Sequence, residues 1–196
     1  MTTLVIWGSA LAAYALFWSW YVGFRRKVTP AEAEATAHAL EAAGAYSEKQ
    51  IATVREFLAN DDGRDFVMIN LLHLKEPLKE SRQDLAAYQE VFMRKMRRNA
   101  GHPVMVATNA SGNIENVACE HADDWHAAAA VRYRSRRDMM EIFLETIGSE
   151  HHQLKLDSME KTFAFASPNW FIAGGPRVLV ALVLALAAAL VQLAVS

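Results

Sequence analysis

The chain has 196 residues, of which 53% are hydrophobic, and a formal net charge of −2. So small a charge, without a basic stretch interleaved with aromatic residues, argues against nucleic acid as a partner. The single cysteine, Cys119, excludes an intramolecular disulfide and suits a reducing compartment.

Two uncharged hydrophobic runs lie near the ends of the chain, at residues 4–24 and 178–195. A helix rises about 1.5 Å per residue, so runs of this length can cross a hydrocarbon layer of about 30 Å. The alternative is a pair of buried core helices, but the rest of the chain is too short to surround both. We therefore predict two transmembrane helices, with membrane lipid as a partner.

The basic residues beside these runs predict their orientation. Arg25, Arg26 and Lys27 follow the first run, and Arg177 precedes the second. Because no charge precedes the first run, it is expected to be an uncleaved anchor. The positive-inside rule then predicts a multi-pass protein of the cell membrane, with a cytoplasmic central region and both termini outside.

Small residues in both runs predict close packing between the two helices. Gly8 and Ala12 form such a face in the first run, and Ala181, Ala185 and Ala189 in the second. Faces of this kind let transmembrane helices approach closely.

Residues 29–60 carry two helix-start patterns. Thr29-Pro30-Ala31-Glu32 and Ser47 to Gln50 each place a hydroxyl cap three residues before a glutamate or glutamine. Gly44 and Asp61-Asp62-Gly63 are expected to end the two helices. We interpret 29–60 as a helical hairpin that links the first anchor to the domain.

The domain itself is expected at 61–167, with strands and helices in alternation. The pattern of branched, apolar and turn residues predicts these elements in order: a strand at 66–74, a helix at 83–99, strands at 104–108 and 114–119 joined by a turn, a strand at 127–133, a helix after Ser135 and a strand at 162–166. The predicted class is α+β with a ferredoxin-like arrangement.

Several segments resemble one known family. They are Phe66-Val67-Met68-Ile69-Asn70-Leu71-Leu72, Leu74-Lys75, Tyr88, Gly101, Trp125 and Arg132-Tyr133-Arg134-Ser135-Arg136. Together, over about residues 60–167, they resemble the dimeric α/β-barrel superfamily and, within it, the domain-of-unknown-function family 1330. Arg134 and His126 depart from the family pattern, which has proline and aspartate there. The resemblance implies a sheet-to-sheet homodimer with a pocket between sheet and helices, in a superfamily that includes oxygenases, isomerases and haem enzymes.

Four residues are candidates for binding a ligand: Asn70, Tyr88, His102 and Arg132. Asn70 lies in an apolar strand, so its amide binds either a ligand or its own fold. Arg132 suits a carboxylate or enolate if it points inward, and otherwise a salt bridge. His102 is placed for acid–base chemistry or is an ordinary loop residue.

Other patterns give no metal or cofactor assignment. Cys119, His121 and His126 match no recurring metal-site spacing, and no metal is predicted. His151 and His152 point about 100° apart on a helix and are expected to be solvated. No serine elbow, glycine-rich phosphate loop or zinc-protease motif is present, which argues against covalent hydrolysis and nucleotide use. The sequence identifies no cofactor.

Two functions remain open. The first is a membrane-anchored binding or assembly module at the cytoplasmic face, acting as a homodimer or higher homo-oligomer. The alternative is a small oxygenase-like or isomerase-like enzyme that acts on a lipophilic metabolite. In either case the expected ligand is apolar or amphipathic, because anchors at both ends hold the domain beside the bilayer.

Overall fold

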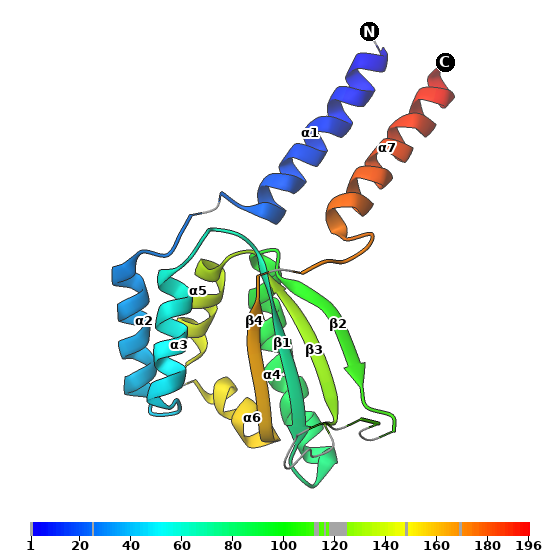
Figure 1. The fold of residues 1–196 in the computed structure, drawn as a ribbon. Helices are drawn as coiled ribbons and strands as arrows, with labels where there is room; N and C mark the ends of the chain where they lie inside the picture. Colours follow the sequence, from blue (N-terminus) through cyan, green and yellow to red (C-terminus); the bar gives the residue numbers. More distant parts are fainter. Residues whose placement is uncertain are drawn as a thin grey trace. The chain divides into compact units, whose positions relative to one another are not determined.

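The computed structural model describes residues 2–24, 26–111, 114–115, 117, 125–147, 149–168 and 170–196. The chain forms two compact units. The first consists of residues 1–24 with 171–196, and the second of residues 25–170. Figure 1 labels the helices and strands of both units.

The first unit consists of two apolar helices, α1 (Thr2–Val22) and α7 (Pro176–Val195). They pack against each other, and each is long and apolar enough to cross a membrane. Near the start of α7, the Tyr14 hydroxyl donates a hydrogen bond to the Arg177 carbonyl at 3.1 Å. The Arg177 guanidinium lies 5.7 Å from the ring centroid of Trp18.

The prediction that Gly8 lies in a close helix contact is wrong. A Cβ atom added at Gly8 would have no neighbour within 4 Å. The buried residue of α7 is instead Ala188, which is 5% exposed. The helices therefore do not approach each other at Gly8.

The second unit contains a four-stranded antiparallel sheet in the order β2-β3-β1-β4. The strands are β1 (Phe66–Leu74), β2 (His102–Thr108), β3 (Ala127–Tyr133) and β4 (Met159–Ser167). With the helices around it, the unit is α+β, as predicted. The strands predicted at 66–74 and 127–133 are confirmed.

The strand predicted at 114–119 is wrong where it can be judged. Ile114, Glu115 and Val117 are not in a strand, and the other residues of that segment lie outside the described residues. The predicted hairpin partner of β2 is replaced by β3, which pairs with β2 from His102 opposite Arg132 to Thr108 opposite Ala127.

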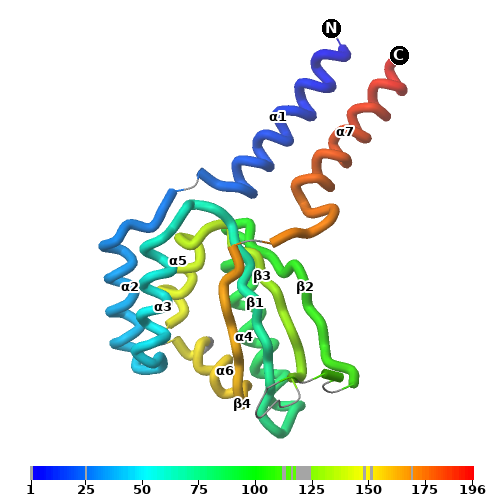
Figure 2. Tube along the Cα trace, viewed as in Figure 1, coloured from blue at the N-terminus to red at the C-terminus, as the bar shows by residue number. Residues whose placement is uncertain are grey.

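The helical hairpin consists of α2 (Pro30–Ala43) and α3 (Glu48–Ala59), and both predicted capping boxes are confirmed. It packs against α5 (Arg136–Thr146), so segments far apart in the sequence lie side by side in Figure 2. Ala37, Leu40 and Ile51 form a buried cluster there, with Ile147 at its edge. The hairpin thus belongs to the same compact unit as the sheet.

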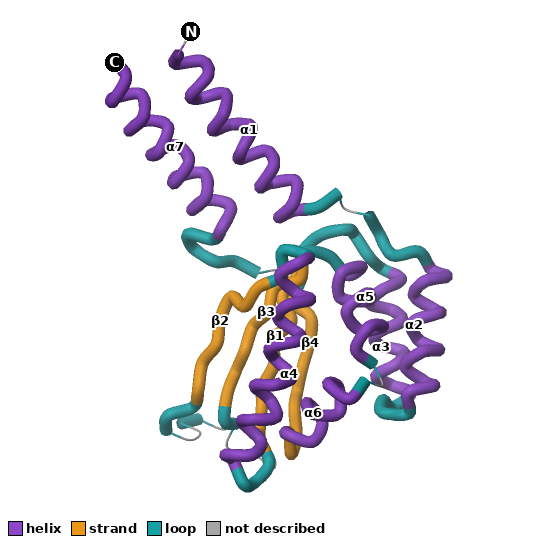
Figure 3. Tube along the Cα trace, turned by 180° about the vertical axis from the view of Figure 1, so that it is seen from behind, coloured by secondary structure: helices purple, strands orange, loops and turns teal. Residues whose placement is uncertain are grey.

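Helices cover one face of the sheet. α4 (Leu78–Arg98) lies across it in Figure 3, and α6 (Glu150–Ser158) packs beside α4. On this covered face, the rings of Phe66 and Tyr133 stack 5.2 Å apart, and Phe57 meets Phe66 edge-on at 5.1 Å. In the described part of this unit, no helix lies over the other face, which we call the open face (Figure 1).

Candidate functional site

Asn70 and Tyr88 lie on the covered face of the sheet. Phe66 and Leu72 of β1 contribute to buried clusters on that face, so alternation directs Asn70 to the same side. On α4, Leu85 packs with the cluster around Leu72, and Tyr88 stacks on Phe92 with ring centroids 5.5 Å apart. Tyr88 is therefore placed between the two ends of the sheet, at the level of Asn70.

A lysine from α6 lies over the Tyr88 ring. The Lys155 ammonium is 5.9 Å from the Tyr88 ring centroid. Burial lowers the pKa of Lys155 and raises that of Tyr88. Among the described residues, no carboxylate pairs with Lys155, and none hydrogen-bonds the Tyr88 hydroxyl.

Tyr46 and His152 extend this group. Tyr46 Oη lies 3.4 Å from His152 Nε2. Burial, and then the charge of Lys155, lower the pKa of His152, while Tyr46 adds to the upward shift in the pKa of Tyr88. His152 and Lys155 lie three residues apart on α6, so the Tyr46–His152 contact and the Lys155–Tyr88 contact are neighbours. We call Tyr46, Tyr88, His152 and Lys155 the Lys155 cluster.

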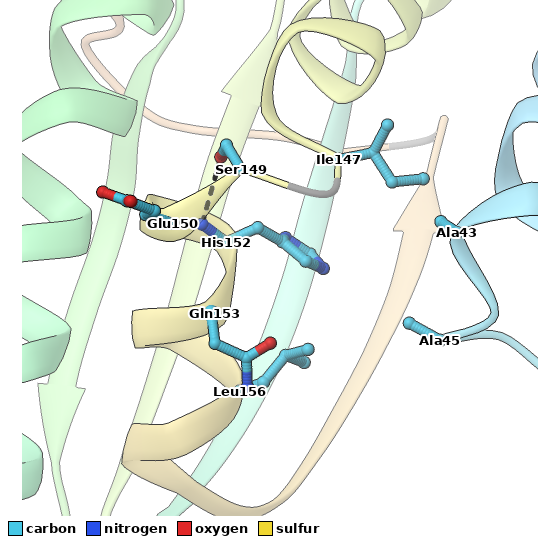
Figure 4. A pocket seen from close by; sticks show the side chains of 8 residues that line it. All are labelled: Ala43, Ala45, Ile147, Ser149, Glu150, His152, Gln153 and Leu156. Carbon is cyan, nitrogen blue, oxygen red and sulfur yellow. Dashed lines mark hydrogen bonds between the residues drawn. The ribbon is translucent and has the colours of Figure 1, made fainter.

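A cavity lies beside His152, between the turn that joins α2 to α3 and the first turns of α6, and the other three members of the cluster are not among the residues that line it. Its volume is about 270 Å³. The lining residues are Ala43, Ala45, Ile147, Ser149, Glu150, His152, Gln153 and Leu156. In Figure 4 the His152 ring points across it toward Ala43 and Ala45. His152 therefore borders both the cavity and the Lys155 cluster, and it is partly buried rather than solvated as expected.

The sequence analysis missed Lys155 and Tyr46 as well as the environment of His152. Residues 150–158 have no apolar stripe, so the sequence predicted a helix at His151 and His152 but not which of its side chains are buried. One signal was present, since His152 and Lys155 are three residues apart and a helix places them on neighbouring faces.

Arg132 and His102 lie on the open-face side instead. Tyr133 is in the core of the covered face, so the adjacent Arg132 points the other way, and His102 pairs with it in register. Arg132 Nε donates to Asp65 Oδ2 at 2.9 Å, and Nη1 donates to the Ala100 carbonyl at 2.9 Å. Arg132 thus takes the salt-bridge alternative. The four predicted residues form two pairs on opposite faces.

Asn70 also bonds its own strands. Its Nδ2 donates to the Met68 carbonyl at 3.1 Å and to the Ala129 carbonyl at 3.4 Å. The amide nitrogen is therefore occupied by backbone. No described group donates to its side-chain oxygen, which leaves that atom available to a ligand.

The histidines weighed as metal ligands are placed only in part. Cys119 and His121 lie outside the described residues. His126 Nδ1 accepts a hydrogen bond from the Leu74 amide at 2.9 Å, and its ring lies 4.6 Å from that of His73. Among the described residues, no group of three or more His, Cys, Asp or Glu could hold a metal ion.

These features define an α+β protein with a four-stranded antiparallel sheet and a polar cluster between the sheet and its helices. No protein-family model and no curated protein matches the sequence. The fold is similar to a crystal structure of RPA0582, a protein of unknown function from Rhodopseudomonas palustris, with a TM-score of 0.50 and 19% identity. That likeness covers 65% of this chain and 96% of the other.

A crystal structure of methylated RPA0582 gives a TM-score of 0.51 and 17% identity, covering 66% of this chain and 95% of that one. At such identities the similarity concerns the fold alone.

Proposed function

We propose that this chain is a membrane-anchored homodimeric module at the cytoplasmic face that binds a small amphipathic molecule. The observation that carries the proposal is the apolar open face of the sheet. Phe163 is 55% exposed there, while Phe165 and Met105 are each 46% exposed. Register places Phe163 opposite Leu71, and Phe165 opposite Ile69. These five side chains would lose contact with water against a second sheet.

The strand order supports a ferredoxin-like assignment for this domain. A strand, a helix, two strands, helices and a final strand follow in the chain, and β1 lies between β3 and β4. Such a split unit is antiparallel with one face open. Membership of the dimeric α/β barrels and of family 1330 is part of this proposal.

Membrane attachment is supported by α1 and α7, because both helices are long enough and apolar enough to span a membrane. Arg26 and Lys27 follow α1, and Arg177 lies in the first turn of α7. Basic residues gather on the cytoplasmic side of membrane helices, where they also attract anionic lipid headgroups. Anchoring would concentrate the protein beside lipophilic molecules and beside other copies of itself.

The dimer is tested by placing a charge on the open face. Phe163→Glu should convert a dimer into a monomer, because a carboxylate at the centre of an apolar interface loses its hydration. The control is Leu144→Glu on α5, since Leu144 is 43% exposed and lies away from the sheet. Both variants and the wild type are compared by chemical cross-linking in native membranes.

We expect dimers for the wild type and Leu144→Glu and monomers for Phe163→Glu. A thermal melt of each variant shows whether the domain remains folded. If cross-linking of the wild type gave only monomers, the proposed dimer would be overturned.

The isomerase-like alternative is favoured by one specific observation. Burial lowers the pKa of Lys155, as in lysines that serve as general bases. A neutral amine beside a bound molecule can accept a proton from carbon. The oxygenase-like alternative has no comparable support among the contacts described.

A further inference from the structure

We propose that the ligand of the Lys155 cluster carries a carboxylate, which binds at the Lys155 ammonium while its apolar part fills the adjoining cavity. The inference rests on the proposed function as a binding module and names the class of molecule bound. It is argued from charge, from the available donors and from the size of the cavity.

Charge is the first argument. Lysine is seldom buried without a partner, because an ammonium that leaves water loses its hydration. Lys155 is partly buried against the Tyr88 ring, and no described carboxylate pairs with it. Glu150 borders the cavity, but in Figure 4 its side chain extends away from His152. A bound anion would supply the missing negative charge.

Hydrogen-bond donors are the second argument. The hydroxyl of Tyr88 has no hydrogen bond to a described residue, and its raised pKa keeps it protonated as a donor. Tyr46 and His152 lie on the other side of the cluster and hydrogen-bond each other, with 3.4 Å between Tyr46 Oη and His152 Nε2. An acid oxygen at Lys155 would thus meet the Tyr88 hydroxyl of α4 as its second donor. A carboxylate accepts from several donors at once.

One ammonium matches one negative charge. Phosphate monoesters carry about −1.5 to −2 at neutral pH and are commonly bound by arginine forks or helix N-termini. The N-terminus of α6 lies at the cavity, but its first turn carries the acidic Glu150, which disfavours a dianion there. The described cluster contains one lysine and no arginine. A carboxylate therefore fits the cluster better than a phosphate.

The cavity limits the rest of the ligand. Ala43, Ala45, Ile147 and Leu156 give it apolar walls. A water molecule has a share of about 30 Å³ in the liquid. A cavity of about 270 Å³ therefore has room for an apolar chain of several carbon atoms. The chain of a medium-chain carboxylic acid has this size.

The probe is octanoate, titrated calorimetrically into the full chain in phosphatidylcholine nanodiscs, with empty nanodiscs subtracted. The matched neutral probe is 1-octanol, and octyl phosphate tests the alternative acid. We expect saturable binding of octanoate that is at least tenfold tighter than that of the alcohol.

Variants then test whether Lys155 is the residue that binds the carboxylate. Lys155→Met keeps the apolar stem and should weaken octanoate binding at least tenfold while leaving 1-octanol unchanged. Lys79→Met removes an exposed lysine of α4 and should change neither. Lys155→Arg, which keeps the charge, should retain part of the octanoate affinity. Thermal melts of all variants exclude unfolding as the cause.

Each contrary result has a distinct meaning. Equal affinity for octanoate and 1-octanol would overturn the carboxylate and leave the binding module intact. Tighter binding of octyl phosphate would assign a phosphate instead and also overturn it. Full octanoate affinity in Lys155→Met would place the acid elsewhere. Binding of none of the three probes would remove the ligand from the proposed function itself.

Discussion

Arg132 shows how one buried charge can be satisfied by the fold alone. Its guanidinium is fully buried and bonds Asp65 from the segment before β1 and the Ala100 carbonyl before β2. These contacts join the starts of two strands to β3. The arginine therefore fixes the position of β3 rather than facing the cavity.

Replacing Arg132 should destabilise the domain without affecting ligand binding. Arg132→Met removes the bonds of a fully buried guanidinium to Asp65 and to the Ala100 carbonyl, and breaking a buried pair costs about 3 kcal/mol or more. The matched control is Arg64→Met, because the Arg64 side chain is 71% exposed and its pairing distance is 3.9 Å. Thermal melts should show a lower Tm for the first variant alone. An unchanged Tm for Arg132→Met would contradict this role.

For Asn70 and Arg132, the sequence left two alternatives open, a contact with a ligand or a contact within the fold, and could not decide between them. Arg132 is 67 positions from its partner Asp65, so its pairing depends on strand register and not on local pattern. Lys155 was missed for a related reason. Its burial comes from α4, which is distant in sequence, while its own helix carries no apolar stripe.

At the scale of elements, the hairpin of α2 and α3 is held to α5 by both charge and apolar contact. Arg137 donates two hydrogen bonds to Glu32, at 2.8 Å from Nη1 and 2.6 Å from Nη2. Leu58 of α3 is 0% exposed within the cluster that contains Phe66 and Met139. The hairpin therefore contributes to the main core.

Truncating Leu58 tests that conclusion. Leu58→Ala removes a fully buried side chain and should destabilise the whole domain by about 2–5 kcal/mol. Glu56→Ala, on an exposed position of the same helix, is the control. Thermal unfolding followed by near-ultraviolet circular dichroism reports on the aromatic rings of the sheet. If that signal melted at the wild-type temperature in Leu58→Ala, the hairpin would be independent of the sheet.

The ion pair of Glu32 predicts a pH dependence. Hydrogen bonds from Arg137, and then from Thr29, hold the pKa of Glu32 well below its ordinary range. A carboxyl with a depressed folded pKa contributes its full stability above its unfolded pKa, which is about 4.3. That contribution is lost as the pH falls below this value, because the unfolded chain takes up the proton first.

The measurement compares the Tm of the wild type with that of Glu32→Gln from pH 7 to pH 3. The difference should be constant down to about pH 5 and then narrow as the pH falls further. Glu48→Gln, in the exposed first turn of α3, should show no such change. A Tm difference that stayed constant down to pH 3 would show that ionisation of Glu32 does not contribute to the stability of the fold.

Elements defined by local signals were predicted well from the sequence. Both capping boxes lie within four residues, so Thr29 and Ser47 could be assigned without tertiary information. The segment at 114–119 has strand-forming residues, yet β2 pairs with the distant β3 and not with a neighbouring hairpin strand at Ile114, Glu115 or Val117. Strand pairing is a competition across the whole sheet, which composition alone does not decide.

At the scale of the whole molecule, one domain lies in sequence between two apolar helices. Two membrane segments per copy would give a dimer four. Such an arrangement limits diffusion to the plane of the membrane and raises the chance that open faces meet. The open face and the anchors would then both favour the dimer, because weak contacts between two sheets are enough to hold copies that already share a membrane.

The orientation of the chain gives the last prediction. Lys27 and Arg177 lie on the domain side of the two apolar helices, and basic residues are retained on the cytoplasmic side during insertion. Alkaline phosphatase, which is active only after export, should therefore be active when fused to either terminus. The same reporter inserted at the exposed Ala110-Ser111 loop should be inactive.

Charge reversal provides the control for this topology. Replacing Arg26, Lys27 and Arg177 together by glutamate removes the described basic bias and should reduce the activity of both terminal fusions. A fluorescent protein that folds only in the cytoplasm should give the opposite pattern at every site. Fluorescence from that protein at either terminus of the unaltered chain would overturn the orientation. The carboxylate site would then face the other compartment, while the contacts that form it would remain the same.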